Sequence, residues 1–248
     1  MRAAILAAGR GERFTKAGIR IDKPLITIGG RPMVARVIEA ASNVGAHHAL
    51  CIVNDLSPVS YNYLTSTTWP IPVRVIRKTT GNSLESFTCL APYLRDEPFL
   101  LFTVDAVFRL TALKRFLRGA RHLGSGVLAL TRFIDDEKPL YIDIGSDRRV
   151  RGVDTDADAS PYVTAGFYYF EPAVLDLLDM AEGAGLNSLR GFFRFLNKSG
   201  YALFGLRVSK TIDVDRPKDI ELAEQLLIGE KLLRKANALG DGAAYRST

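Results

Sequence analysis

The chain has 248 residues, of which 47% are hydrophobic and 24% are charged, and its mean hydropathy is +0.06. These proportions are those of a soluble globular protein, and they exclude a disordered or collagen-like chain. The net charge of +6 is compatible with nucleic acid, a membrane surface or a small anionic substrate as a partner. The basic residues are scattered, however, and none of them form a run of five. We therefore expect no nucleic-acid-binding tail.

The sequence shows no secretory pattern near Met1 and no run of about 18 apolar residues. We therefore expect no membrane span and a cytoplasmic protein. Cys51 and Cys89 lie in separate apolar segments, and two isolated thiols form neither a disulfide framework nor a metal-binding pattern. We expect both to be free thiols in a reducing compartment.

Apolar segments of strand length alternate with segments of helical periodicity in the first half of the chain. Residues 3–8 form a continuous apolar run bounded by glycine, which is typical of a strand inside a parallel sheet. A loop is expected from residue 9 to about Gly30. The next expected strands are 49–53, 73–76, 99–104 and 126–130. The expected helices begin near Pro32 and cover 59–64, the later part of 81–94, and 113–123.

The second half has a looser pattern of strands joined by turns. The expected strands are 140–144, 149–153, 163–170 and 201–208, and the expected helices are 172–180 and 188–197. Alternation of this kind predicts an α/β protein, a Rossmann-like three-layer α/β/α fold with a mainly parallel mixed sheet. No repeat or linker divides the sequence, so we expect a single domain over 1–248.

A turn of small residues follows the first expected strand, and basic residues follow that turn. Such a turn lets backbone N–H groups approach phosphate oxygens, and Arg13 and Lys23 would add positive charge beside it. A tight turn with surface charges explains the glycines equally well. A dinucleotide fingerprint would need glycine in place of Phe14, and no Walker loop is present.

The longer pattern is more specific than its glycines. The segment L-A-A-G-R-G-E-R from Leu6 to Arg13, followed by K-P-L from Lys23 and G-R-P-M from Gly30, resembles the signature of the sugar-phosphate nucleotidyltransferases. These are the NDP-sugar pyrophosphorylases and the related cytidylyltransferases. The resemblance extends to about residue 228. It implies a fold of the nucleotide-diphospho-sugar transferase type.

The resemblance also implies roles for individual residues. The glycine-rich loop of the family wraps the triphosphate, and the Arg and Lys that match Arg13 and Lys23 neutralise its charge, so these two are the expected catalytic residues. The nucleotide-binding residues implied in the loop are Leu6, Ala7, Ala8, Gly9 and Gly11.

Two acidic positions match the metal-binding positions of the family. Asp105 follows the apolar run 99–104 and would project at the carboxyl edge of the sheet. Asp213 lies in T-I-D-V-D-R-P, which resembles the family motif I-D-V-D-T-P. The resemblance implies a Mg²⁺ site on Asp105 and Asp213, with helix capping as the alternative for each. For Asp215, capping is the favoured interpretation, and a share in the metal site stays open.

A third matching segment, Thr79-Thr80-Gly81-Asn82-Ser83, follows the strand at 73–76. The family carries its base-recognising turn at this position, which implies nucleotide contacts from Thr80, Gly81 and Asn82. Capping of the following helix by Asn82 or Ser83 is equally compatible with the sequence.

Departures from the family pattern concern the acceptor. Val104 stands where the family often has glycine, and Thr164 replaces the asparagine of a sugar-contacting strand. Glu137-Lys138-Pro139 imitates a sugar-site motif but precedes the expected hairpin at 140–153, so it is interpreted as a turn. These changes leave the identity of the acceptor open.

The implied reaction transfers a nucleoside monophosphate from an NTP (CTP, UTP, dTTP or GTP) to a sugar 1-phosphate or a similar phosphate monoester, with Mg²⁺, and releases pyrophosphate. The expected parts of the domain are a nucleotide-binding part over about 1–110, an acceptor-binding part over about 111–210 and a C-terminal helix over about 216–236. The base, the acceptor and the oligomeric state stay open. The alternative is a catalytically inactive homologue that senses nucleotides, which the presence of Arg13, Lys23, Asp105 and Asp213 disfavours.

Overall fold

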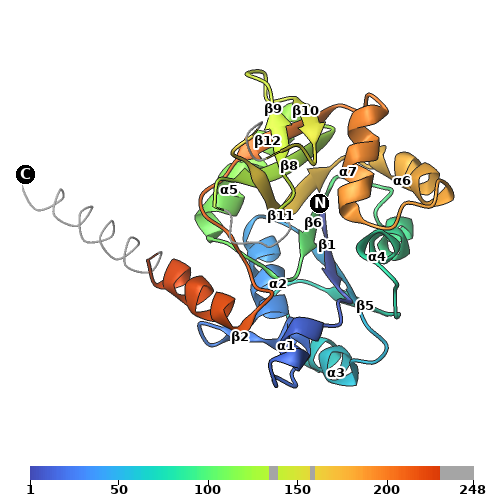
Figure 1. Cartoon of the computed structure of the whole chain (residues 1–248). Helices are drawn as coiled ribbons and strands as arrows, with labels where there is room; N and C mark the ends of the chain where they lie inside the picture. Colours follow the sequence, from blue (N-terminus) through green and yellow to red (C-terminus); the bar gives the residue numbers. More distant parts are fainter. Residues whose placement is uncertain (134–138, 157–159, 230–248) are drawn as a thin grey trace, which may run out of the picture.

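A computed structural model describes residues 1–133, 139–156 and 160–229, and a seven-stranded sheet forms its centre (Figure 1). The strand order is β12-β8-β11-β6-β1-β4-β5, and every neighbouring pair is parallel except the two pairs made by β11. The strands are β1 (Arg2–Ala7), β4 (His48–Val53), β5 (Val73–Arg77), β6 (Phe99–Thr103), β8 (Gly126–Thr131), β11 (Val163–Phe170) and β12 (Leu203–Arg207). The predicted mixed, mainly parallel sheet is confirmed.

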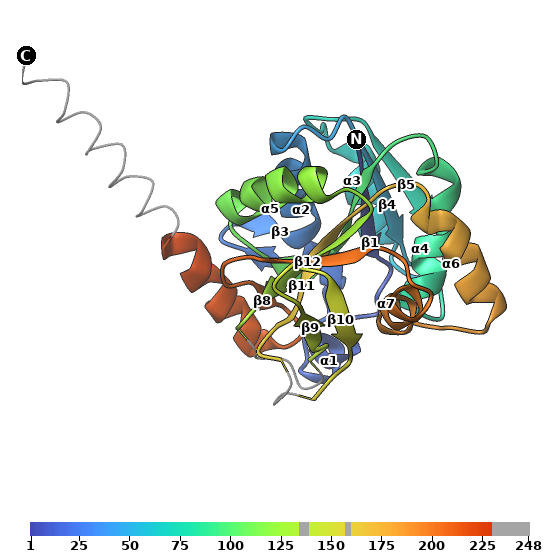
Figure 2. The same ribbon diagram turned by 90° about the horizontal axis from the view of Figure 1, so that it is seen from above.

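Helices cover both faces of this sheet and complete three layers (Figure 2). One apolar cluster joins Ile5 of β1 to Val34 and Phe116, which lie on the helices of one face. These helices are α2 (Met33–Asn43), α3 (Pro58–Ser66) and α5 (Leu110–Leu123). A second cluster joins Leu101 of β6 to Phe87 and Phe192 on the other face. The helices there are α4 (Ser83–Leu90), α6 (Val174–Gly183) and α7 (Leu189–Lys198). The predicted α/β/α class is therefore confirmed.

The segment from residue 9 to about Gly30 is not the plain loop that the sequence predicted. It contains a short helix, α1 (Glu12–Lys16), a 3₁₀ turn, η1 (Lys23–Leu25), and β2 (Thr27–Ile28), which pairs with β3 (Arg31–Pro32). Phe14 on α1 and Ile28 on β2 are fully buried. Each element is one turn or two residues long, which is too short for its periodicity to be recognised in a sequence.

A second short pairing lies at the carboxyl edge of the sheet. β7 (Ala106–Val107) pairs antiparallel with β13 (Ile212–Asp213), whereas the sequence predicted no strand at either place. In the central sheet Leu6 is in register with both Ile52 and Thr103. The ends of β1, β4 and β6 therefore meet at one edge, beside this short pairing.

Three sequence predictions fall partly outside the described residues. The C-terminal helix predicted over 216–236 is helical over 217–229, and the rest lies beyond the description. Glu137 and Lys138 of the predicted turn also lie outside it, as do 157–159 of the predicted loop before Ser160. The expected hairpin is present as β9 (Ile142–Ile144) and β10 (Val150–Val153). Within the described ranges, no helix has both the length and the apolar character that crossing a bilayer requires.

The two thiols are expected to differ in reactivity. Burial raises the pKa of the fully buried Cys51 thiol on β4 from 9.0 to about 12, whereas Cys89 on α4 is partly exposed. Because the thiolate is the reactive form, we expect a disulfide reagent at pH 8 to label one thiol per native chain and two in denaturant. Cys89→Ser should abolish the native labelling. Rapid native labelling of Cys51 would contradict this.

Candidate functional site

A cavity of about 550 Å³ opens beside the glycine loop at the carboxyl edge of the sheet. Its lining residues are Leu6, Ala8, Gly9, Arg10, Gly11, Glu12, Thr80, Gly81, Asn82, Ser83, Ser86, Thr103 and Asp105. Every residue predicted to bind nucleotide is among them except Ala7. The side chain of Ala7 is buried in the apolar cluster beneath α2, because neighbouring residues of a strand face opposite sides of the sheet.

The two walls of this cavity are joined by Asn54, a residue that the sequence analysis missed. Asn54 is 2% exposed, and its Nδ2 donates a hydrogen bond to the Ala8 carbonyl oxygen at 3.3 Å. Thr79 Oγ1 donates to Asn54 Oδ1 at 2.9 Å. The sequence feature that could have identified Asn54 is its position directly after a buried strand, because side chains there reach the ligand-binding edge of such sheets.

The turn before α4 caps this helix. Asn82 Oδ1 accepts a hydrogen bond from the Glu85 backbone N–H at 2.9 Å, and Glu85 Oε2 accepts one from the Gly81 N–H at 2.7 Å. This reciprocal arrangement satisfies two backbone donors at the helix N-terminus. The capping interpretation of Asn82 is therefore confirmed. Contact of Thr80, Gly81 and Asn82 with a base stays a prediction, although all three line the cavity.

Lys23 lies beside the glycine loop and reaches two carboxylates. Its Nζ donates to Asp105 Oδ2 at 2.6 Å and also to Asp215, and only 10% of its side chain is exposed. The residue before it, Asp22, accepts hydrogen bonds from the N–H and hydroxyl of Ser60 at 3.1 and 2.8 Å. Gly11, with φ +62°, packs against Lys23, where an added Cβ would be 3.1 Å from the Lys23 Cβ. The loop and α3 thus hold Lys23 in place.

The charges of this group are mutually stabilised. Burial alone would lower the pKa of Lys23, but Asp105, Asp215 and Asp213 outweigh it and hold that pKa above its ordinary value. Burial would in turn raise the pKa of Asp105, but the charge and hydrogen bond of Lys23 keep it lower than usual. Both groups are therefore charged at neutral pH.

Three carboxylates converge where the glycine loop meets β7 and β13. One ligand oxygen from each of Asp105, Asp213 and Asp215 lies within 4.8 Å of the others. The β7–β13 pairing and a hydrogen bond of 3.1 Å from the Val214 N–H to the Asp105 carbonyl oxygen bring them together. The structure thus unites the two residues predicted to bind metal, and carboxylate oxygens are the donors that Mg²⁺ prefers.

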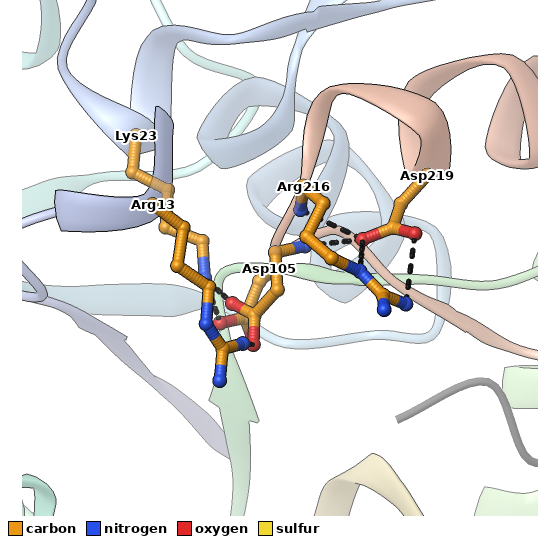
Figure 3. Close-up of polar contacts among 6 residues, drawn as sticks. Arg13, Lys23, Asp105, Arg216 and Asp219 are labelled. Carbon is orange, nitrogen blue, oxygen red and sulfur yellow. Dashed lines mark hydrogen bonds and ion pairs between the residues drawn. The ribbon is translucent and has the colours of Figure 1, made fainter. Parts of the chain in front are cut away.

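The Asp215 carboxylate has contacts that the sequence did not predict, and capping of the C-terminal helix by this residue stays a prediction. Its carboxylate accepts hydrogen bonds from both Lys23 and Arg13, and the side chains converge as Figure 3 shows for Arg13, Lys23 and Asp105. Asp219, in the first turn of this helix, reaches back to the residues before it, and its Oδ2 accepts from the backbone N–H groups of Asp215 and Arg216 at 3.0 and 2.7 Å. Asp219, which is 1% exposed, was missed.

A second cavity, of about 340 Å³, adjoins the first and shares Ser83, Thr103 and Asp105 with it. The segment Thr164-Ala165-Gly166 of β11, which matches the sugar-contacting strand of the family, lines it together with other polar residues. These are Thr131, Tyr168, Arg190, Thr211 and Asp213. Two cavities of different lining therefore meet at Asp105.

Gly166 permits the close approach of β11 to the end of β6. It has a φ of +77°, and the pairing of β11 with β8 shifts register between Thr164 and Tyr168. Its carbonyl oxygen accepts a hydrogen bond from Thr103 Oγ1 at 3.3 Å. An added Cβ would stand 2.3 Å from the Ala106 Cβ and 2.8 Å from Thr103 Oγ1, which is too close for any side chain.

Gly166→Ala is therefore expected to lower both stability and activity. The positive φ costs about 1–2 kcal/mol and the overpacking adds about 1–3 kcal/mol, and both displaced neighbours flank Asp105. Gly200→Ala is the matched control, because Gly200 has a φ of +73° and open space around its added Cβ. Urea denaturation measures both variants. An equal loss of stability in the two would contradict steric crowding at Gly166.

Solved structures with a similar fold include proteins whose titles name nucleotidyltransferases. The solved structure titled inositol-1-phosphate CTP transferase from T. maritima matches with a TM-score of 0.75 at 20% identity, over 91% of this chain and 95% of that one. A putative glucose-1-phosphate thymidylyltransferase from Bacillus anthracis matches with a TM-score of 0.80 at 14% identity, over 91% and 94%. At these identities the likeness establishes the fold.

Relatives in sequence include a probable mannose-1-phosphate guanylyltransferase 1 of Oryza sativa, which is 23% identical over 73% of this chain and 52% of its own length. The mannose-1-phosphate guanyltransferase of Saccharomyces cerevisiae is 24% identical over 98% of this chain and 69% of its own. The chain thus spans about half of the rice protein and about two thirds of the yeast protein. The family model described as MobA-like NTP transferase domain matches residues 3–162, which include the glycine loop, Lys23 and Asp105. The predicted relationship is therefore confirmed, and the chain belongs to the MobA-like NTP transferase family.

Proposed function

We propose that this chain transfers a nucleoside monophosphate from an NTP to a phosphorylated acceptor, a sugar 1-phosphate or a similar phosphate monoester, and releases pyrophosphate. The supporting observation is that two cavities meet at Asp105, one beside the glycine loop and one beside β11. The first would hold the NTP and the second the acceptor. Their shared boundary would place the acceptor phosphate beside the α-phosphorus of the NTP.

The bond changes need no general base. An oxygen of the acceptor phosphate, which is already anionic at neutral pH, attacks the α-phosphorus. The bond from the α-phosphorus to the oxygen bridging it to the β-phosphorus breaks, and pyrophosphate leaves with that electron pair. Catalysis then depends on alignment and on neutralisation of the phosphate charges.

Lys23 and Arg13 are the proposed catalytic residues. The side chain of Lys23 is nearly buried and bonded to Asp105, the residue at which the two cavities meet. Its ammonium would hold oxygens of the α-phosphate and of the acceptor phosphate against their mutual repulsion. Arg13 is more exposed and meets Lys23 on the shared carboxylate of Asp215. Its guanidinium would stabilise the negative charge that accumulates on the departing pyrophosphate.

The same geometry fits a magnesium ion. Three carboxylates offer oxygen atoms that lie within 4.8 Å of one another. Mg²⁺ prefers such oxygen ligands and completes its coordination with water and phosphate oxygens. Asp105 and Asp213 would hold it, and Asp215 is within reach. A bound Mg²⁺ would act as a Lewis acid and stabilise negative charge on the phosphate oxygens. Lys23 would then exchange its contacts with Asp105 and Asp215 for contacts with phosphate oxygens.

The proposal is tested by pyrophosphate release. The purified chain is incubated with Mg²⁺, each of CTP, UTP, dTTP and GTP, and a panel of acceptors that includes hexose 1-phosphates, inositol 1-phosphate and phosphocholine. We expect release that requires both one NTP and one acceptor. A thermal-shift screen of the same NTPs measures binding separately, because a ligand of the native state raises its melting temperature.

The two measurements distinguish the proposal from its alternative. Stabilisation by an NTP without pyrophosphate release from any acceptor would indicate a nucleotide-sensing homologue and would contradict the transferase assignment. Release by NTP alone would indicate hydrolysis instead of transfer.

A further inference from the structure

A third cavity, of about 560 Å³, carries three basic side chains and adjoins the proposed acceptor cavity. It lies where β8 and β12 end and β11 begins, and it is lined by Leu130, Thr131, Arg132, Phe133, Tyr162, Arg207, Val208 and Lys210. Thr131 and Phe133 also line the proposed acceptor cavity. The two cavities are therefore neighbours on the ligand-binding edge of the sheet.

Two aromatic rings hold the three cations. The guanidinium carbons of Arg132 and Arg207 lie 5.2 and 4.9 Å from the centre of the Tyr162 ring, and Lys210 Nζ lies 3.7 Å from the centre of the Phe133 ring. Arg132 Nη2 also donates a hydrogen bond of 3.1 Å to the Tyr162 hydroxyl. A guanidinium that rests on a ring keeps its in-plane N–H groups available for an oxyanion.

The supporting ring is itself fixed. Tyr162 is 6% exposed, its N–H donates to Ser160 Oγ at 3.2 Å, and its carbonyl oxygen accepts from the Ile142 N–H at 2.9 Å. The guanidinium groups of Arg132 and Arg207 are thus held on a rigid support. This arrangement is expected of a preorganised anion site, because the side chains would lose little conformational entropy when an anion binds.

The charge of this cavity is not neutralised within the described part of the chain. No carboxylate of residues 1–133, 139–156 or 160–229 forms an ion pair with Arg132, Arg207 or Lys210. Two like charges share one ring, and a third lies on the neighbouring ring. An oxyanion with two or more negative charges would offset the repulsion among these three cations. Two of its oxygens could accept paired hydrogen bonds from a guanidinium group.

We propose that this cavity binds a second anionic group of the acceptor, a phosphate or a carboxylate that does not attack the NTP. The inference rests on the proposed function, since the acceptor phosphate that attacks the NTP must reach Asp105 and Lys23, neither of which lines this cavity. An acceptor that fills the acceptor cavity and continues past Thr131 and Phe133 would present its far end to Arg132, Arg207 and Lys210. The acceptor class is then a doubly anionic molecule, such as a sugar bisphosphate or a phosphorylated sugar acid.

Binding of glucose 1-phosphate and glucose 1,6-bisphosphate tests the proposal with a matched pair of probes. Titration calorimetry with Mg²⁺ present compares the full chain with Arg132→Gln/Arg207→Gln and with Lys210→Met. We expect the unmodified chain to bind the bisphosphate at least tenfold more tightly than the monophosphate. The double substitution should remove this preference without changing the affinity for the monophosphate, and Lys210→Met should reduce it.

Arg118→Gln/Arg121→Gln is the control, because it removes the same charge from exposed positions of α5 outside the three cavities. Lys210→Met leaves the Tyr162 contacts in place, so it remains informative if the double variant fails to fold. Equal affinities of the unmodified chain for the two probes, lack of bisphosphate binding, or a preference that survives the substitutions would each overturn the proposal.

Pyrophosphate release separates this inference from the function on which it rests. If no acceptor supports release but the bisphosphate preference depends on the two arginines, the anion site stands and the transferase assignment fails. If release occurs and the substitutions change no affinity, only the anion site fails. If 10 mM inorganic phosphate alters turnover of a monophosphate acceptor through these residues, the cavity is an effector site and its role as an acceptor subsite is overturned.

Discussion

Lys23→Ala is expected to lower kcat for pyrophosphate release by about 10³-fold, because removal of one preorganised donor to a developing phosphate charge costs about 10²–10³ and Lys23 is proposed to serve two phosphates. The side chain is 90% covered and bridges Asp105 and Asp215, so water cannot replace its charge efficiently. Initial rates at saturating NTP and acceptor measure the effect. Lys16→Ala, on the exposed part of α1, is the control.

The same variant has a second readout that does not depend on turnover. Without the positive charge of Lys23, the carboxylates of Asp105, Asp213 and Asp215 repel one another more strongly. A bound divalent cation therefore relieves more repulsion in this variant than in the unmodified chain. We expect Mg²⁺ to raise the melting temperature of Lys23→Ala more than that of the unmodified chain. A rate within tenfold of the unmodified chain would contradict the catalytic assignment. An equal effect of Mg²⁺ on the two melting temperatures would contradict the charge argument.

The sequence predicted the strands of the sheet within one or two residues because their signal is local. Residues 99–104 were predicted as a strand from an unbroken apolar run, and β6 covers Phe99–Thr103. The same run located Asp105 at the carboxyl edge of the sheet. Buried strands of a parallel sheet need no partner to be recognised, since burial on both faces makes each of them continuously apolar.

What the sequence did not predict depends on contacts between distant residues. The β7–β13 pairing involves two residues on each side, and Lys23 meets Asp215 across 192 positions. Both arise from the packing of completed elements, so no local propensity indicates them. Asp215 shows the consequence. Its position just before a helix favoured capping, and nothing local indicated that its carboxylate also meets Arg13 and Lys23.

This division of roles among the aspartates leads to a separate prediction. Asp105→Asn and Asp213→Asn are expected to lower kcat/KM by about 10³-fold, because a metal's electrostatic stabilisation of a transition state amounts to several kcal/mol. Both variants should also bind Mn²⁺ more weakly, as measured by electron paramagnetic resonance. Asp215→Asn should retain Mn²⁺ binding and lose about tenfold in kcat/KM, because its carboxylate orients Arg13 and Lys23. Asp179→Asn, on α6 and 56% exposed, controls for loss of a surface charge.

Comparison of the Asp213 and Asp215 variants identifies the second metal ligand. The two residues are separated by one residue, and a carboxylate oxygen of each lies within 4.8 Å of one of Asp105. If Asp215→Asn abolishes Mn²⁺ binding and Asp213→Asn does not, the ligand is Asp215 and the alignment of the I-D-V-D motif must shift by two residues. If neither substitution weakens binding, the three carboxylates do not form a metal site, and Lys23 and Arg13 would be the neutralising groups that remain. Because Asp105 contacts Lys23 and lines both cavities, its substitution should impair transfer in either case.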